Sequence, residues 1–368
     1  MIRDTPAGLY IHVPFCKTIC PYCDFYSLTD RSHVHDWRAA LRLELERSRR
    51  RFPPFDTVFF GGGTPSAIDP ACLSSLLEAL FEEPLIECTI ELNPVDVTPE
   101  LVSRYLGSGI GRLSLGVQSM NDGELRFLGR RHNAAQALRA MDICREAGCR
   151  NLAVDLMFGL PGQRTRDCID SLRQILACAP EHLSCCQLTV AHGTPLGESI
   201  ASGRVHEPPE DDQCAAFLSI SDYLRNHGYE HYEVSNYSLG EKYRCRHNLK
   251  YWRHHPYLGL GPAAHSFLGT ERWWNIADVR EYCSRLNCGG DAVEERETLT
   301  AEQLRLERLA LGFRAIDGVA FADLAGAETW EPCLEQLIEN GLLLPQANRI
   351  IPTAEGYLLA DRLALEFA

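Results

Sequence analysis

The chain has 368 residues, of which 45% are hydrophobic and 23% are charged, which excludes collagen-like, disordered and coiled-coil proteins. Its 36 basic and 50 acidic side chains give a formal net charge of −14. Because this charge repels phosphate backbones and anionic lipid headgroups, we expect no nucleic-acid partner and at most peripheral membrane association. The sequence has no run of 18 apolar residues, and its first ten residues lack a basic start followed by an apolar stretch. We therefore expect a cytoplasmic protein.

Residues 8–235 alternate short apolar segments with amphipathic segments of helical period. The expected strands are 9–13, 57–60, 89–92, 112–117, 152–157 and 183–190, with a last extended run at 232–234. The expected helices are 34–51, 70–82, 98–107, 133–147, 166–178 and 210–227. This alternation predicts parallel strands joined by crossover helices. The predicted fold class is α/β, a partial (β/α)6 barrel like part of a TIM barrel, and an open doubly wound sheet is the alternative.

The pattern changes after residue 236. Residues 237–297 are rich in aromatic residues, histidine and glycine and show no clear strand–helix period, whereas residues 298–368 predict a smaller α+β module. In that module helices at 300–314, 320–326 and 330–340 precede a hairpin that turns at Asn348 and a helix from Thr353. This order resembles a winged helix, but its acidic residues favour a packing or partner surface over DNA: Glu328, Glu331, Glu335 and Glu339. We therefore predict three parts: a barrel (1–236), a connecting region (237–297) and a winged-helix-like module (298–368).

Three of the sixteen cysteines are clustered directly after the first expected strand. Cys16, Cys20 and Cys23 lie in the segment His-Val-Pro-Phe-Cys-Lys-Thr-Ile-Cys-Pro-Tyr-Cys, which begins at His12. Thiolates this close together are ligands for soft metals, either zinc or an iron–sulfur cluster. One reading is a structural zinc site with His12 as fourth ligand. The other is a four-iron cluster, in which three thiolates leave one iron open to a small molecule.

The spacing Cys-x3-Cys-x2-Cys, with Tyr22 just before the last cysteine, resembles the signature of the radical SAM superfamily. The resemblance implies a [4Fe–4S] cluster whose free iron binds the amino and carboxylate groups of S-adenosylmethionine (SAM). Gly-Gly-Gly-Thr-Pro at 61–65, after the second expected strand, resembles the superfamily motif that holds the methionine amino group. Glycines in such a turn allow the backbone to approach a ligand closely.

Polar residues follow or end the next expected strands: Glu91, Gln118, Arg130 and Asp155. Each alone could be a helix cap or part of a surface ion pair, but ligand sites of βα barrels gather at the carboxyl ends of strands. Arg130 suits the SAM carboxylate, and Asp155 or Gln118 suits the ribose hydroxyls. The predicted SAM-binding residues are Tyr10, Tyr22, Gly62, Gly63, Thr64, Glu91, Gln118, Arg130 and Asp155.

Longer motifs resemble the oxygen-independent coproporphyrinogen oxidase family. They are Tyr-Ile-His-Val-Pro-Phe-Cys (10–16), Glu-Leu-Asn-Pro (91–94), Leu-Gly-Val-Gln-Ser (115–119), Asp-Leu-Met-Phe-Gly-Leu-Pro-Gly-Gln (155–163) and Gly-Leu-Gly-Pro-Ala-Ala-His-Ser (259–266). Within this family the oxidases carry a fourth cysteine two positions after the third, where this chain has Phe25. The HemW-type haem chaperones have Asp-Phe there and a His-Asn-x-x-Tyr-Trp motif, which Asp24-Phe25 and residues 247–252 match. The resemblance implies a protein that binds haem and passes it to respiratory haem proteins, at the inner face of the cytoplasmic membrane.

The residue types around this second motif suit haem. The His247 imidazole is a common axial ligand, Cys245 is a second possible ligand, and Tyr251 and Trp252 offer flat apolar faces. Five basic residues and no acid occur within residues 242–253, which suits haem propionates: Lys242, Arg244, Arg246, Lys250 and Arg253. Residue types alone are equally compatible with a loop that packs over the barrel.

Three rival functions stay open at this point. A class C radical SAM methyltransferase would share the scaffold and use two SAM molecules on an aromatic substrate. Oxygen-independent coproporphyrinogen III oxidation is disfavoured by Phe25, and a zinc-stabilised binding module would contain no iron. Cys185 and Cys186 are adjacent in an expected strand and point to opposite faces, so at most one reaches the site.

Overall fold

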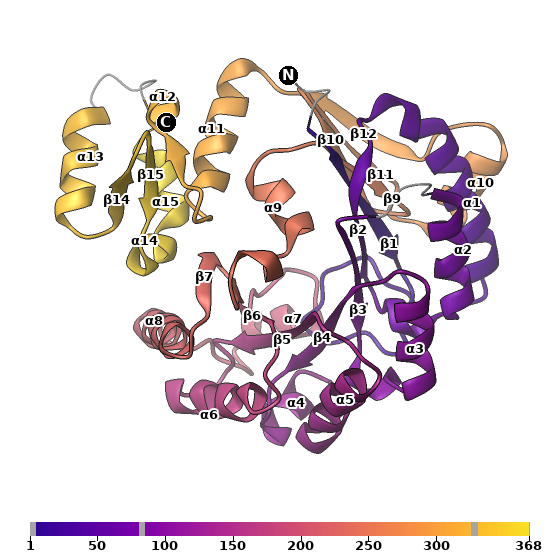
Figure 1. Cartoon of the computed structure of the whole chain (residues 1–368), viewed down its shortest axis with the longest axis horizontal. Coiled ribbons are helices and arrows are strands. Elements are labelled where there is room, and N and C mark those ends of the chain that lie inside the picture. The colour runs from indigo at the N-terminus through magenta and orange to yellow at the C-terminus, as the bar shows by residue number, and fades with distance from the viewer. Residues whose placement is uncertain (1–4, 81–84, 325–329, 368) are drawn as a thin grey trace.

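The computed structural model describes residues 5–80, 85–324 and 330–367 (Figure 1). Within these residues, one sheet has the strand order β12-β11-β10-β9-β1-β2-β3-β4-β5-β6-β8-β7. Six neighbouring strands of this sheet are parallel. They are β1 (Ala7–Val13), β2 (Phe55–Gly62), β3 (Glu87–Leu92), β4 (Arg112–Gln118), β5 (Leu152–Phe158) and β6 (His182–Gln187). The predicted α/β class and partial barrel are confirmed.

Crossover helices cover the outer face of the curved sheet (Figure 1). They are α1 (Val34–Ser48), α2 (Pro70–Leu80), α3 (Pro99–Gly107), α5 (Ala134–Glu146), α6 (Thr165–Leu176) and α8 (Glu210–Asn226). Each lies within a few residues of its predicted range, and the predicted residues 81–82 are outside the described part of the chain. Asn133 and Gln136 form a capping box at the start of α5, so the local sequence fixes where that helix begins.

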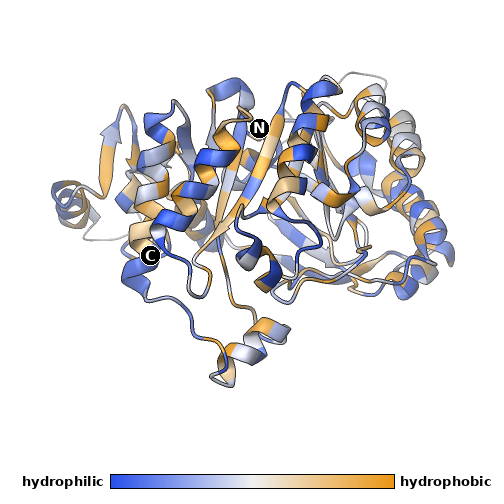
Figure 2. Cartoon of the chain, turned by 90° about the horizontal axis from the view of Figure 1, so that it is seen from below, coloured by the Kyte–Doolittle hydropathy of each residue, from blue (hydrophilic) through white to orange (hydrophobic). Residues whose placement is uncertain are grey.

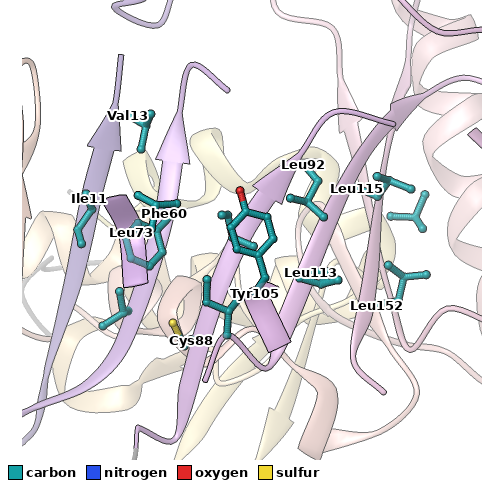
Figure 3. Close-up of a cluster of buried hydrophobic side chains, with 14 of the residues drawn as sticks. Ile11, Val13, Phe60, Leu73, Cys88, Leu92, Tyr105, Leu113, Leu115 and Leu152 are labelled. Atoms are coloured by element: carbon teal, nitrogen blue, oxygen red, sulfur yellow. The ribbon is translucent and has the colours of Figure 1, made fainter. Parts of the chain in front are cut away.

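The main core lies between the sheet and these helices (Figure 3). Ile11, Phe60 and Leu113 point from the strands toward Leu73 of α2 and Tyr105 of α3, and all five side chains are buried. In Figure 2 the central strand segments are mostly hydrophobic, and the helices alternate hydrophobic and hydrophilic residues along their length. Strands buried on both faces explain why the sequence shows continuous apolar runs here. No helix of the described residues is long and apolar enough to cross a membrane.

Short elements escaped the sequence analysis. α4 (Asp122–Phe127) and α7 (Pro195–Ala201) are too short to show a helical period. The strand expected at 183–190 ends at Gln187, and the extended run at 232–234 belongs to β7 (Glu230–Glu233).

Residues 237–297 continue the same sheet rather than forming a sheet of their own. β8 (Asn236–Ser238) pairs with β6 and β7, and β9 (Tyr257–Leu260) lies parallel to β1. The antiparallel strands β10 (His265–Leu268), β11 (Glu271–Asn275) and β12 (Val293–Thr298) complete that edge. α9 (Arg246–Trp252) and α10 (Val279–Asn287) lie between them in sequence. Because β8 begins at residue 236 itself, the predicted boundary at this point cuts through a paired strand.

The C-terminal residues form a separate small core around Leu309, Phe313, Leu343, Ile350 and Phe367. The elements are α11 (Ala301–Gly312), β13 (Val319–Ala320), α12 (Phe321–Leu324), α13 (Trp330–Glu339), β14 (Leu343–Gln346), β15 (Arg349–Pro352), α14 (Ala354–Leu358) and α15 (Ala360–Leu365). Their order and the three-stranded sheet β13-β15-β14 agree with the predicted winged-helix-like module. Predicted helix residues 325–326 and Glu328 lie outside the described residues.

Candidate functional site

A cavity of about 360 Å3 opens at the carboxyl ends of the parallel strands. All of the predicted cluster and SAM residues except Tyr10 line it: Cys16, Cys20, Tyr22, Cys23, Gly62, Gly63, Thr64, Glu91, Gln118, Arg130 and Asp155. Tyr10 lies behind this lining, with its ring stacked against Phe59, which does line the cavity. Residues that are up to 139 positions apart in sequence, from Cys16 to Asp155, therefore face one space.

The cysteine loop leaves β1 and folds back on itself. The Cys16 amide donates to the Leu28 carbonyl at 2.8 Å, and the Leu28 amide donates to the Pro14 carbonyl at 2.6 Å. Cys16 is buried, whereas Cys20 and Cys23 are half-buried. Burial raises the pKa of the Cys23 thiol, and the neighbouring Cys20 and Cys16 thiols raise it further. Mutual repulsion of this kind is relieved when thiolates share a metal centre, so the donor set suits a cationic cluster.

The reading with His12 as a zinc ligand does not fit this geometry. His12 Nε2 lies 2.8 Å from the Tyr26 carbonyl oxygen, so this nitrogen carries the proton. His12 Nδ1 accepts from the Tyr10 hydroxyl at 3.2 Å. Both ring nitrogens are therefore engaged, and burial lowers the pKa of the imidazole. Among the described residues, no three His, Cys, Asp or Glu side chains are grouped as ligands of a single metal ion.

The glycine turn after β2 fits closely against the cysteine loop. Its amides at Gly63 and Thr64 donate to the carbonyls of Val13 and Phe15 at 2.8 and 2.9 Å. Gly62 has φ +104°, and a Cβ there would lie 2.6 Å from the His12 ring. A Cβ on Gly63 would lie 3.0 Å from Cys16 Sγ. A side chain at position 62 would press on His12, and one at position 63 would press on Cys16. This close approach explains both glycines.

Glu91 and Asp155 form an acidic pair on one wall of the cavity. Burial and then the Asp155 charge raise the pKa of Glu91 to about 8, although the Gly62 amide donates to its carboxylate. Burial also raises the pKa of Asp155, which accepts from the Ser114 hydroxyl at 3.1 Å. At neutral pH the two carboxyl groups together therefore carry less than two negative charges. It can accept and donate hydrogen bonds, and a cationic ligand would lower both pKa values.

Arg130 and Gln118 lie beside this acidic pair, because β4 is the strand between β3 and β5 and Arg130 bonds to Gly116, which is paired with Asp155. Arg130 Nη2 donates to the Gly116 carbonyl at 2.6 Å, its Nη1 lies 3.7 Å from Cys20 Sγ, and its buried Nε has no protein partner. Gln118 has φ +69° at a break in the β4–β5 register. A backbone strained in this way at a cavity is typical of a functional position. A Cβ on Gly116 would lie 3.1 and 3.3 Å from the Gln118 and Arg130 side chains, so the glycine leaves room for both.

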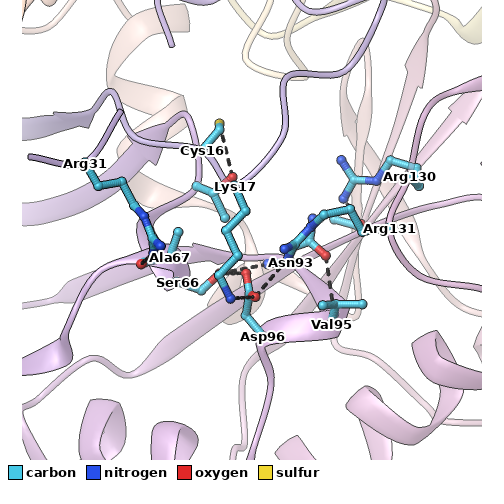
Figure 4. A network of polar contacts seen from close by, with 12 residues as sticks. Cys16, Lys17, Arg31, Ser66, Ala67, Asn93, Val95, Asp96, Arg130 and Arg131 are labelled. Carbon is cyan, nitrogen blue, oxygen red and sulfur yellow. Dashed lines mark hydrogen bonds and ion pairs between the residues drawn. The ribbon is translucent and has the colours of Figure 1, made fainter. Parts of the chain in front are cut away.

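Sequence reasoning missed a polar network that joins these loops (Figure 4). Asp96, in the single-turn helix Pro94–Asp96, bonds to Lys17, Arg131 and Ser66. The available signals were an acid soon after the third strand and a second arginine beside Arg130.

The predicted haem segment lies at the opposite rim of the sheet. Glu87, the first residue of β3, accepts from the backbone amides of Arg246 and His247 at 2.8 and 3.1 Å and so holds the start of α9. His247 also lies 3.1 Å from Thr57 Oγ1 near the start of β2. Asn248 of the same helix lines the cavity. Therefore α9 is the floor of the cavity that has the cysteines at its mouth.

The predicted haem ligands are enclosed by protein in this conformation. His247 is 1% exposed, and its Nδ1 and Nε2 are hydrogen-bonded to Thr57 and Tyr251. Burial and the nearby Lys250 charge lower the pKa of His247 to about 3. Cys245 is 0% exposed, with its Sγ 3.4 Å from Glu87 Oε1. The expectation of an available axial ligand at either position does not fit this arrangement, whereas Tyr251 and Trp252 are half-buried.

The basic run of residues 242–253 is largely neutralised by acids from other elements. Arg244 bonds to Glu230 at 2.8 and 2.9 Å, Lys250 to Asp56 at 2.7 Å, and Arg253 to Asp317 at 2.5 Å. Lys242 and Arg246 are exposed. The predicted patch of five cations is thus reduced to these two. Of the adjacent cysteines of β6, Cys185 lies in the core and Cys186 lines the cavity, as the alternation of a strand requires.

Comparison with known proteins agrees with this site. A model of the radical SAM superfamily matches residues 10–175. A heme chaperone HemW of Mycobacterium tuberculosis is 34% identical, over 97% of this chain and 93% of its own. One of Bacillus subtilis is 31% identical, over 96% of this chain and 97% of its own. The chain belongs to the HemW family of radical SAM proteins. Membership confirms the predicted family and implies a [4Fe–4S] cluster and SAM.

The fold of this HemW family member also matches a solved structure over nearly its whole length. Coproporphyrinogen III oxidase (HemN) of Escherichia coli, a radical SAM enzyme, superposes with a TM-score of 0.80 and 21% identity. The match covers 98% of this chain and 90% of HemN. The barrel and the C-terminal module are therefore one shared architecture, since the match runs through both.

Proposed function

We propose that the protein is a cytoplasmic haem chaperone that holds a [4Fe–4S] cluster and SAM, binds haem and passes it to respiratory haem proteins at the inner face of the cytoplasmic membrane. The observation that carries this proposal is the extent of the similarity. Proteins named heme chaperones match 96 to 97% of this chain, so the match includes α9 and the C-terminal module as well as the barrel. The Asp24-Phe25 pair, with phenylalanine where the oxidases have a fourth cysteine, supports the same assignment.

Different cavity residues would bind the cluster and the separate parts of SAM. Cys16, Cys20 and Cys23 would ligate three irons, and the bound cluster would supply one-electron chemistry at an iron free of protein ligands. The buried Nε of Arg130 is the donor that suits the SAM carboxylate. Glu91 and Asp155 would bind the cationic and hydroxyl parts of SAM, since burial raises the pKa of both carboxyl groups and a bound cation would lower it again.

Haem binding at α9 requires movement of that helix. His247 can ligate iron only after it leaves Thr57 and Tyr251, and Cys245 only after it leaves Glu87. The exposed Lys242 and Arg246 are then available for propionates. Haem uptake thus competes with closure of the cavity floor.

A spectroscopic titration tests the proposal. Anaerobically purified protein, with its cluster, is titrated with haem, and about one haem per chain is expected. His247→Ala should weaken binding, while His227→Ala at the exposed end of α8 serves as the matched control. Transfer is then measured with an apo-form of a haem protein as acceptor. Absence of haem binding by the unmodified protein would contradict the chaperone proposal. Unchanged affinity in both His247→Ala and Cys245→Ala would show that haem binds elsewhere.

The same preparation separates the rival functions. Conversion of coproporphyrinogen to protoporphyrinogen would establish an oxidase instead. A methylated product together with S-adenosylhomocysteine would establish a methyltransferase. Zinc in colourless protein would establish a zinc-stabilised module.

A further inference from the structure

Asp96 connects the three loops that surround the cofactor cavity. Its side chain is 2% exposed. Asp96 Oδ1 lies 2.7 Å from Lys17 Nζ and 2.9 Å from Arg131 Nη2, and Oδ2 accepts from Ser66 Oγ at 3.2 Å (Figure 4). Each partner adjoins a predicted cofactor contact or its turn. Lys17 follows Cys16, Arg131 follows Arg130, and Ser66 follows the glycine turn.

The turn that carries Asp96 is itself fixed from the glycine loop. The Ser66 hydroxyl donates to Asp96 and also accepts from the Asn93 amide at 3.1 Å. Asn93 in turn caps the single-turn helix, since its side chain accepts from the Val95 amide at 3.3 Å. The carboxylate is therefore held in place by Ser66 and its own turn as well as by the two cations.

From this arrangement we infer that Asp96 is a positioning residue, which holds the cysteine loop and Arg130 in the geometry that the cluster and SAM require. Two cations share one carboxylate oxygen, so Asp96 is the counter-charge that allows them to lie side by side. Asp96 is the buried member of both pairs, because Lys17 and Arg131 are 40% and 23% exposed, so loss of either cation leaves a buried charge with fewer partners. Without the carboxylate, Lys17 and Arg131 would repel each other, and their neighbours Cys16 and Arg130 would move with them. The inference rests on the proposed cluster and SAM site.

The test compares Asp96→Asn with Asp69→Asn. Asp69 pairs with Arg104 at 2.9 Å on the exposed surface, so it controls for loss of an aspartate charge outside the cavity. Both variants are reconstituted anaerobically, and three quantities are measured: iron content, the electron paramagnetic resonance (EPR) spectrum of the reduced cluster with and without SAM, and SAM affinity. We expect Asp96→Asn to weaken SAM binding about tenfold or more and to change the EPR spectrum. Asp69→Asn should match the unmodified protein.

Variants that remove only one of the two cations bound to Asp96 separate positioning from folding. They also test the inference if Asp96→Asn does not fold. Lys17→Met should change the EPR spectrum in the absence of SAM, because it releases the residue beside Cys16. Arg131→Gln should weaken SAM binding while the SAM-free spectrum and the iron content stay unchanged. Spectra and SAM affinities equal to those of the unmodified protein in the variants that fold would overturn the inference.

A haem titration of the unmodified protein is run in parallel. If haem does not bind while Asp96→Asn changes the EPR spectrum, the chaperone proposal fails and the role of Asp96 stands. If haem binds and Asp96→Asn changes nothing, only the inference about Asp96 fails.

Discussion

His247 Nε2 and the Tyr251 hydroxyl lie 2.8 Å apart, one helical turn from each other on α9. Both residues belong to the His-Asn-x-x-Tyr-Trp segment, and the His247 ring also stacks on Phe59 of β2 with centroids 5.3 Å apart. These contacts, with the hydrogen bond between His247 and Thr57, occupy both ring nitrogens of His247 and tie the helix to the barrel. The segment proposed to bind haem thus also contributes Asn248 to the cavity lining, so the proposed haem capture would require this part of the cavity to open.

Acidification should destabilise the fold through His247. Its pKa is about 3 in the folded protein and 6.5 when unperturbed, so the unfolded chain binds more protons between these values. Stability is therefore lost as the pH falls below 6.5, by about 2 kcal/mol from this group between pH 6.5 and pH 5. Urea unfolding at both pH values measures the loss. His247→Gln should reduce it by that amount, and His227→Gln should not. Equal losses in all three proteins would contradict the buried neutral imidazole.

Removal of any one thiol of the cysteine loop should abolish cluster assembly. Cys16→Ala, Cys20→Ala and Cys23→Ala are each expected to lose most of the iron and sulfide and the brown colour, because in the proposed assignment these three thiolates would be the only protein ligands of the cluster. Cys186→Ala is the matched control, since Cys186 lines the same cavity outside the motif. Metal analysis with a visible spectrum makes the measurement. Loss of iron in Cys186→Ala would place a ligand where none is proposed.

Arg130→Lys should weaken SAM binding without loss of iron. Lysine keeps the positive charge but lacks the planar guanidinium group. In Arg130 that group bonds to Gly116 through Nη2 and at the same time presents Nε to the cavity. The expected loss is about tenfold in affinity, measured by equilibrium binding to the reconstituted protein. Arg126→Lys, on the exposed face of α4, should bind SAM normally. Normal binding by Arg130→Lys would remove Arg130 from the site.

The positive φ of Gln118 predicts an unusual order of stability among its variants. Both Gln118→Gly and Gln118→Ala lose the amide side chain, but only alanine keeps the left-handed strain. The glycine variant should therefore be more stable than the alanine variant by about 0.5 to 1 kcal/mol, since strain relief exceeds the entropy cost of glycine. Thermal and urea unfolding of the two variants measure the difference. The reverse order would show that the backbone is not strained there.

Much of the barrel could be predicted because its parallel strands are buried on both faces and leave continuous apolar runs. The edge strands could not. β12 reads Val-Glu-Glu-Arg-Glu-Thr and is mostly exposed, so it carries no apolar signal, and β8 has three residues. The rule that ligands gather at the carboxyl ends of strands correctly placed Glu91, Gln118 and Asp155 around one cavity.

Contacts between distant segments could not be read from the sequence. Asp96 pairs with Lys17 and Arg131, which are 79 and 35 positions away. The basic run of residues 242–253 contains no acid, yet Glu230, Asp56 and Asp317 reach it from elsewhere in the fold. A local count of charges therefore overestimated the positive potential at α9.

The position of β1 inside the sheet has a consequence for biosynthesis. Its two neighbours are β2, which follows soon after it, and β9, which begins at Tyr257. While the nascent chain emerges from the ribosome, one edge of the strand that leads into the cysteine loop stays unpaired until Leu260 has been translated. The native pairing of β1, and with it the final setting of the cysteine loop, therefore forms only after residues 257–260 have been made.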